Sequence, residues 1–148
     1  MLIGKYDFSV DSKNRIFLPS KFRHDLAGIC VLSKDMQEKC LNLYPPRQWE
    51  LFTQKIEELP TIKMKKVREL IYSKSCEIEL DSQGRVVLNE NFCDDVGVRT
   101  LKEKEVVIVG INTHVQIWGI LEWQEHQKEL NSDENVAAAI DDLIELGF

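Results

Sequence analysis

The sequence predicts a β-rich α+β fold in which one small unit occurs twice and packs as an internal pseudo-dimer with flanking helices. An Asp-Ser-x-x-Arg pattern occurs at Asp11 and again at Asp81, with similar residues around it. Each copy alternates apolar and polar residues, as half-buried strands do. A unit of about 45 residues can scarcely bury its own apolar face. Two copies packed against each other would solve this within one chain.

Aligning Asp11 with Asp81 relates residues 6–28 to residues 77–97. The apolar positions then correspond in pairs: Ile16 and Val86, Leu18 and Leu88, Phe22 and Phe92, Leu26 and Val96. Farther on, residues 40–49 resemble residues 114–123. The offset between the copies is 70 at the turn and 74 at the later segment, so the second copy is longer.

Each copy is expected to form a ββαββ unit. The Asp and Ser side chains can accept hydrogen bonds from nearby amides, and Asn14 or Gly84 suits the positive φ of a tight turn. This predicts a hairpin whose second strand begins at the Arg. Alternation then separates a buried set from an outward set. The buried set is Ile16, Leu18, Val86 and Leu88, and the outward set is Arg15, Phe17, Arg85 and Val87.

A short helix is expected next, because Pro19 or Asn89 lies near its start and Gly28 or Gly97 follows its last turn. Two further strands complete each unit. They are predicted at residues 29–33 and 41–44 in the first copy, and at 106–109 and 115–118 in the second.

Helices are predicted to connect and follow the units. After Pro45-Pro46, Trp49, Phe52, Ile56 and Leu59 form an apolar stripe at helical spacing. Pro60 ends this helix, a second is expected over residues 62–73, and a weak acidic helix is expected beyond Asn131. The predicted parts are residues 5–47 and 75–121 for the two units, 48–74 for the helical connector and 122–148 for the tail.

The net charge is −6, but it is unevenly distributed. Residues 1–70 hold 13 Lys and Arg and 9 Asp and Glu, whereas residues 71–148 hold 6 and 16. Such asymmetry can accompany nucleic-acid binding by the basic part.

The sequence offers no enzyme signature. The four cysteines form no Cys-x-x-Cys pair and the three histidines stand alone, so we expect buried reduced thiols, no metal and no cofactor. There is no Gly-rich phosphate loop and no nucleophile elbow. No apolar run is long enough for a membrane span, and no signal-peptide core is present, which favours the cytoplasm.

The segments DSKNRIFLPSKFR, DSQGRVVLNENF and LYPPRQWELFTQKIEEL are similar to the MraZ family, and the similarity runs from Leu2 to about Gln127. The resemblance implies two tandem swapped-hairpin units of the SpoVT/AbrB type that form an intramolecular pseudo-dimeric β-barrel. It also implies a DNA-binding, nucleoid-associated transcription regulator that acts as a ring-like homo-oligomer. The implied targets are tandem promoter repeats upstream of the division and cell-wall operon.

The resemblance places the DNA-binding face at the two turns. Arg15 and Arg85 would donate to guanine in the major groove. Asp11 and Asp81 would hold the turns and orient the arginines. The residues expected to contact phosphates are Lys13, Lys21 and Arg23. All three belong to the first copy, so we expect the first copy to matter more. Asn14 stands where the family commonly has Gly, and Asn89 where it has Pro.

Other interpretations remain open at this stage. From the residues alone, each Asp–Arg pair could equally be a structural bridge that braces a hairpin. An AbrB-like antitoxin or another protein-interaction module is a second class of function, although such antitoxins usually carry one unit per chain. A neighbouring methyltransferase is a further protein partner that the resemblance implies.

Overall fold

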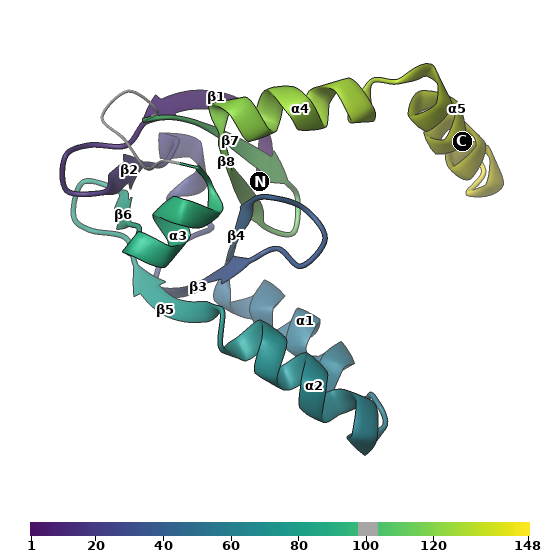
Figure 1. The fold of residues 1–148 in the computed structure, drawn as a ribbon, viewed down its shortest axis with the longest axis horizontal. Helices are drawn as coiled ribbons and strands as arrows, with labels where there is room; N and C mark the ends of the chain where they lie inside the picture. Colours follow the sequence, from purple (N-terminus) through teal and green to yellow (C-terminus); the bar gives the residue numbers. More distant parts are fainter. Residues whose placement is uncertain (98–103) are drawn as a thin grey trace.

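The computed structural model describes residues 1–97 and 104–148, and it confirms a mixed, strand-rich α+β fold (Figure 1). These residues form eight strands, five α-helices and one 3-10 helix. The first half contains β1 (Ile3–Ser9), β2 (Arg15–Phe17), η1 (Ser20–Phe22), β3 (Ile29–Lys34), β4 (Leu41–Tyr44), α1 (Pro46–Glu57) and α2 (Thr61–Tyr72). The second half contains β5 (Ser75–Glu79), β6 (Arg85–Val87), α3 (Glu90–Asp95), β7 (Glu105–Ile111), β8 (Val115–Gly119), α4 (Ile120–Leu130) and α5 (Asp133–Glu145).

The two halves of the chain are joined through their strands. Six strands form one antiparallel sheet in the order β1-β7-β8-β4-β3-β5, and β2 pairs with β6 in a separate two-stranded ribbon. Thus β1 of the first copy pairs with β7 of the second, and β5 of the second pairs with β3 of the first. Ile16 lies opposite Val86, and Asn42 lies opposite Gln116. Both of these residue pairs, Ile16–Val86 and Asn42–Gln116, join positions that correspond in the two copies.

The core draws on both halves. Ile16, Leu18, Val86 and Leu88 are almost completely buried, which confirms the alternation predicted from the sequence. They belong to one cluster with the corresponding pairs Phe22 and Phe92, and Leu26 and Val96. The ring of Phe22 meets that of Tyr6 edge-on, with 5.4 Å between centroids. Because the two copies share one core, the apolar side chains of each copy are buried partly by the other copy.

Two helical arms extend from this body (Figure 1). The predicted connector helices are confirmed as α1 and α2, and Arg68 of α2 forms an ion pair with Glu57 of α1. Near the middle of α1, the ring of Phe52 stacks on Tyr44 with 5.3 Å between centroids. The second arm is α4 followed by α5. None of the described helices combines the length and apolar character needed to cross a bilayer.

Three sequence-based expectations need correction. In the first copy, the predicted hairpin is reduced to the single bridge between Val10 and Ile16. The strand before the turn, β1, pairs with β7 instead of with β2. The first copy has only the 3-10 turn η1 where a helix was expected, whereas the second has α3 capped by Asn89. Cys76 is only partly buried, unlike the other three thiols.

Candidate nucleic-acid interface

The first Asp–Arg turn is organised by one carboxylate. Asp11 Oδ1 accepts hydrogen bonds from the backbone amides of Lys13 and Arg15, both at 2.9 Å. Asp11 Oδ2 accepts from Arg15 Nε at 2.7 Å. Asn14 takes φ 58° at the tip, as predicted for this position. The turn therefore fixes both the loop backbone and the direction of the arginine side chain.

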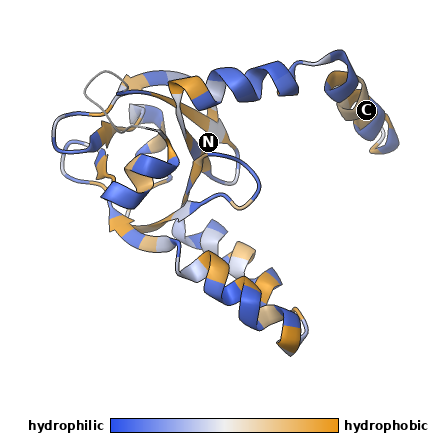
Figure 2. Cartoon of the chain, in the orientation of Figure 1, coloured by the Kyte–Doolittle hydropathy of each residue, from blue (hydrophilic) through white to orange (hydrophobic). Residues whose placement is uncertain are grey.

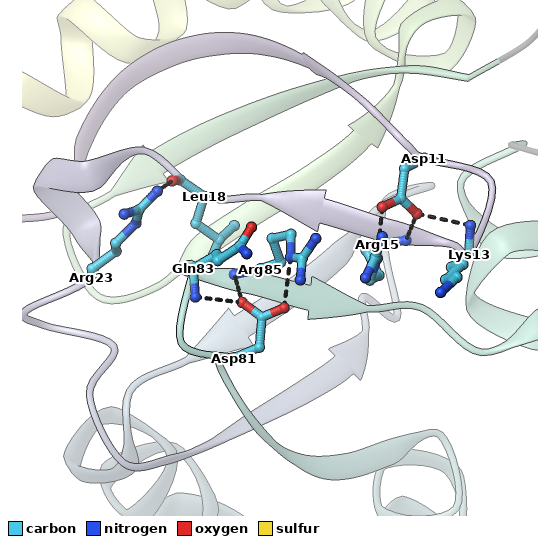
Figure 3. Close-up of polar contacts among 8 residues, drawn as sticks. All are labelled: Asp11, Lys13, Arg15, Leu18, Arg23, Asp81, Gln83 and Arg85. Atoms are coloured by element: carbon cyan, nitrogen blue, oxygen red, sulfur yellow. Dashed lines mark hydrogen bonds and ion pairs between the residues drawn. The ribbon is translucent and has the colours of Figure 1, made fainter.

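The second turn repeats this geometry. Asp81 Oδ1 accepts from the amides of Gln83 and Arg85 at 2.9 Å, and Oδ2 accepts from Arg85 Nε at 2.6 Å. Gly84 occupies the tip with φ 76°. Figure 3 shows the two Asp–Arg pairs at the loops that lead into the neighbouring strands β2 and β6. In each pair the aspartate accepts from Nε of the arginine. The Nη1 and Nη2 groups of Arg15 and Arg85 have no hydrogen-bond partner among the described residues.

The two turns also brace each other. The amide of Leu18 donates to the carbonyl of Gly84 at 3.0 Å, and the amide of Leu88 donates to the carbonyl of Asn14 at 2.8 Å. Each strand that leaves one turn is thereby tied to the tip of the other turn. The β2–β6 ribbon and both loops are consequently joined into one hydrogen-bonded element built from residues 70 positions apart.

The outer face of this ribbon carries both arginines. Ile16 and Val86 point into the core, and the alternate positions point outward. Arg15 lies opposite Val87, and Arg85 lies opposite Phe17, with its guanidinium carbon 5.5 Å from the Phe17 ring centroid. Phe17 is 40% exposed and Val87 is 57% exposed. Sequence reasoning placed these two apolar residues outward but gave them no role in the site, although exposed apolar residues beside an arginine are a usable signal.

The flanking cations are distributed differently from the sequence-based expectation. Lys13 and Lys21 are exposed on the first copy. Arg23, also of the first copy, lies against the second turn: a Cβ added to Gly84 would stand 2.1 Å from its Nε. Arg23 Nη2 also approaches the Leu18 carbonyl at 3.5 Å (Figure 3). Arg23 thus adds a cation beside the second turn, which has Gln83 at the position of Lys13, and the two turns are more alike in charge than the sequence indicates.

The hydrogen bonds change the titration of the turn carboxylates. Partial burial raises the pKa of Asp11, but the hydrogen bonds from Arg15 and Lys13 and the guanidinium charge outweigh it and lower this pKa to about 2. The pKa of Asp81 is also lowered, first by the hydrogen bond from the Arg85 amide. Both carboxylates are therefore ionised at neutral pH, and each holds its arginine by a charge-assisted bond.

A pH experiment should reveal this contribution. A carboxylate with a lowered folded-state pKa stabilises the fold fully above its unfolded pKa of about 4, and this stabilisation is lost as the pH falls toward about 2. We expect Asp11→Asn to lose less stability than the wild type between pH 5 and pH 2, measured by denaturant unfolding at each pH. Parallel curves for the two proteins would show that the turn does not depend on the charge.

Among the described residues, the cysteines and the potential metal ligands do not form a second candidate site. Burial raises the pKa of the Cys30 thiol to about 11 and raises that of Cys40 and Cys93 as well. Such thiols are poor nucleophiles and poor metal ligands at neutral pH. Within residues 1–97 and 104–148, no three His, Cys, Asp or Glu side chains gather as metal ligands would.

Comparison with known proteins identifies the family. The family model described as "MraZ protein, putative antitoxin-like" matches residues 1–69 and 71–144. The chain belongs to the MraZ family. It is 36% identical over 140 residues to the "Transcriptional regulator MraZ" of Alkaliphilus oremlandii, covering 93% of this chain and 91% of that protein. The MraZ proteins of Caldicellulosiruptor bescii and Clostridium tetani, with the same description, are 36% and 33% identical, each over 97% of this chain and 99% of their own length.

Proposed function

We propose that this protein is a sequence-specific DNA-binding transcriptional regulator that reads the major groove with the β2–β6 ribbon. The observation that carries the proposal is the shared outer face of the ribbon, where the Nη groups of Arg15 and Arg85 have no hydrogen-bond partner among the described residues and the two turns brace each other. The major groove of B-DNA admits a two-stranded ribbon. Membership of a family whose relatives are named transcriptional regulators supports the same function.

The proposed division of labour follows from the contacts. Arg15 and Arg85 donate to guanine O6 and N7 through their Nη groups, while Asp11 and Asp81 hold Nε and keep each guanidinium oriented. Diagonal neighbours on a ribbon lie about 7–8 Å apart. Base pairs rise by about 3.4 Å, so the two arginines are expected to contact bases about two steps apart.

Other groups on this surface would add affinity. Phe17 and Val87 are exposed beside the arginines and can pack against thymine methyl groups. The proposed phosphate contacts are Lys13, Lys21 and Arg23. Phosphate contacts add affinity that depends on salt and carry little sequence information.

We further propose that residues 5–47 and 75–121 are swapped-hairpin units that close an intramolecular pseudo-dimeric barrel, with residues 48–74 as connector and 122–148 as tail. The pairing of β1 with β7 and of β5 with β3 supports this arrangement. Its role would be to place two turns side by side, so that one chain offers the paired surface for which a single-unit protein would need two chains.

Several copies would act together on DNA. The two turns of one chain present few cations and the chain carries a net charge of −6, so its affinity for one DNA site should be weak. A ring-like homo-oligomer on tandem promoter repeats, upstream of the division and cell-wall operon in the nucleoid, would raise the effective concentration.

The corresponding prediction concerns repeat number. We expect binding to a duplex with three repeats to be at least about 100-fold tighter than binding to one repeat, because the later contacts become intramolecular. Fluorescence anisotropy with equal-length duplexes measures both affinities. Equal affinity for one and three repeats would contradict the proposed cooperation between copies.

A glycine substitution tests the place of Arg23. Gly84→Ala should push Arg23 away from the second turn and reduce the slope of log K against log salt by about 1, as Arg23→Ala should. Gly28→Ala is the matched control, since it imposes a similar positive-φ strain at φ +83° with no atom within 4 Å. An unchanged slope in Gly84→Ala would remove Arg23 from the interface.

A further inference from the structure

Helix α5 has an apolar face that no described part of its own chain covers. Val136, Ile140, Leu143 and Ile144 recur at helical spacing and are 43–62% exposed, and no residue of α5 is buried among the described residues. The helix nevertheless has a Ser132 cap that accepts a hydrogen bond from the Asn135 amide. A well-capped amphipathic helix with no covered face is typical of a segment that docks elsewhere.

The charge of α5 indicates which surface it fits. Asp133, Glu134, Asp141, Asp142 and Glu145 lie within it, and it has no Lys or Arg. Glu134 and Asp141 flank the apolar face on the same side, because they are seven residues apart. A complementary surface would therefore be apolar and basic.

Helix α2 presents such a surface. Ile62 is 90% exposed and Leu70 is 51% exposed, and both lie on the side of the helix that also carries Lys63 and Lys66. Over its whole length α2 has four cations and one anion, and none of its described residues is buried. Figure 2 shows orange residues among blue ones on both α2 and α5.

The two helices of one chain do not reach each other. In Figure 1, α2 extends from the β5 side of the body, whereas α5 lies beyond the far end of α4. The partner for α5 must then be on a different molecule. We propose that α5 of one copy docks, through its apolar face, on the Ile62–Leu70 face of α2 of a second copy, with its acids beside Lys63 and Lys66.

This contact would be heterologous, because each copy would use α5 to bind one neighbour and α2 to bind the other. A head-to-tail contact that repeats generates a closed ring or an open filament. The inference thus deepens the proposed function and rests on it in one respect, namely that several copies assemble. It names the two surfaces through which they would do so.

A mixing experiment tests the head-to-tail contact. Light scattering after size exclusion should give a multiple of 17.2 kDa for the wild type, but 17.2 kDa for Ile140→Glu and for the pair Ile62→Glu with Leu70→Glu. Mixing the two variants leaves one intact α5 and one intact α2, so a species of twice that mass should form and nothing larger. Leu121→Glu is the control, because Leu121 is 61% exposed on α4 and should leave the wild-type mass unchanged.

A charge exchange tests the specificity of the pairing. Glu134→Lys with Asp141→Lys should dissociate the assembly, as should Lys63→Glu with Lys66→Glu. Combining all four substitutions in one chain should restore the wild-type mass, because the charges are again opposite. Assembly that survives the α5 variants, or that is lost in them but not in the α2 variants, overturns the proposal.

One further measurement separates this inference from the proposed function. At low salt, the monomeric Ile140→Glu chain should bind a duplex with a single repeat as the wild type does, because its turns are intact. If single-repeat binding were retained in the double variant Arg15→Ala with Arg85→Ala, the proposed role of the turns would fail and the docking inference would be unaffected. If instead Ile140→Glu assembled normally, the inference would fail while the DNA-reading role of the turns stood.

Discussion

Replacing Arg15 and Arg85 together with alanine is expected to abolish sequence-specific binding while the protein stays folded. Each arginine leaves a turn whose backbone is held by an aspartate, so removing the side chain should remove the proposed base contact and leave the loop in place. A bidentate arginine–guanine pair discriminates by about 1–3 kcal/mol. We expect each single variant to lose roughly 5- to 150-fold in specific affinity. The double variant should bind the specific duplex no better than random DNA.

The control for this experiment is Lys13→Ala. Lys13 contributes only its backbone amide to the turn, and its exposed side chain is assigned to phosphate. Its removal should weaken binding to all sequences about equally and lower the salt slope by about 1. Anisotropy titrations with specific and random duplexes at several salt concentrations separate the two effects. Retained specificity in the double variant would place the reading surface elsewhere.

Replacing Phe22 with alanine is expected to destabilise the whole molecule. Its side chain is completely buried, contacts Tyr6 and lies in the cluster that both copies share. Truncating a buried Phe costs about 3–5 kcal/mol. Because β1 pairs with β7 and β5 with β3, we expect the loss to appear in one transition rather than in the first copy alone. Denaturant unfolding of the variant and wild type measures it.

The tryptophan signals can follow the halves separately. NMR signals of the three indole groups report on Trp49 in the connector and on Trp118 and Trp123 in the second half. All three should shift at the same denaturant concentration in Phe22→Ala. Early loss of the Trp49 signal with Trp118 and Trp123 unchanged would contradict the shared core. Lys39→Ala is a suitable control, because its side chain is 81% exposed.

Much of the local structure could be predicted from the sequence, because it depends on neighbouring residues. The Asp-Ser-x-x-Arg pattern specifies a loop in which one carboxylate accepts from two amides and an Nε, and both turns form it. Alternation also identified the buried Ile16 and Val86. These outcomes follow from hydrogen-bonding capacity and side-chain period, which act within a few residues.

The remaining features depend on contacts between the copies. Nothing near Val10 indicates that its strand pairs with β7 rather than with the strand after the turn, because both are apolar and extended. The position of Arg23 was hidden for the same reason: the glycine that accommodates it is 61 residues away at Gly84. Phe17 gained a neighbour, Arg85, only through the register of β2 with β6.

Base-analogue substitution shows directly whether Arg15 and Arg85 read guanine. A duplex from the region upstream of the protein's own gene would carry 7-deazaguanine, which lacks the N7 acceptor, at single guanines. We expect two positions, about two base steps apart, where the analogue weakens wild-type binding roughly tenfold. At one of them it should have no further effect on Arg15→Ala, and at the other no further effect on Arg85→Ala. If the analogue weakened the wild type and both variants by the same factor at every position, the arginines would not be reading guanine.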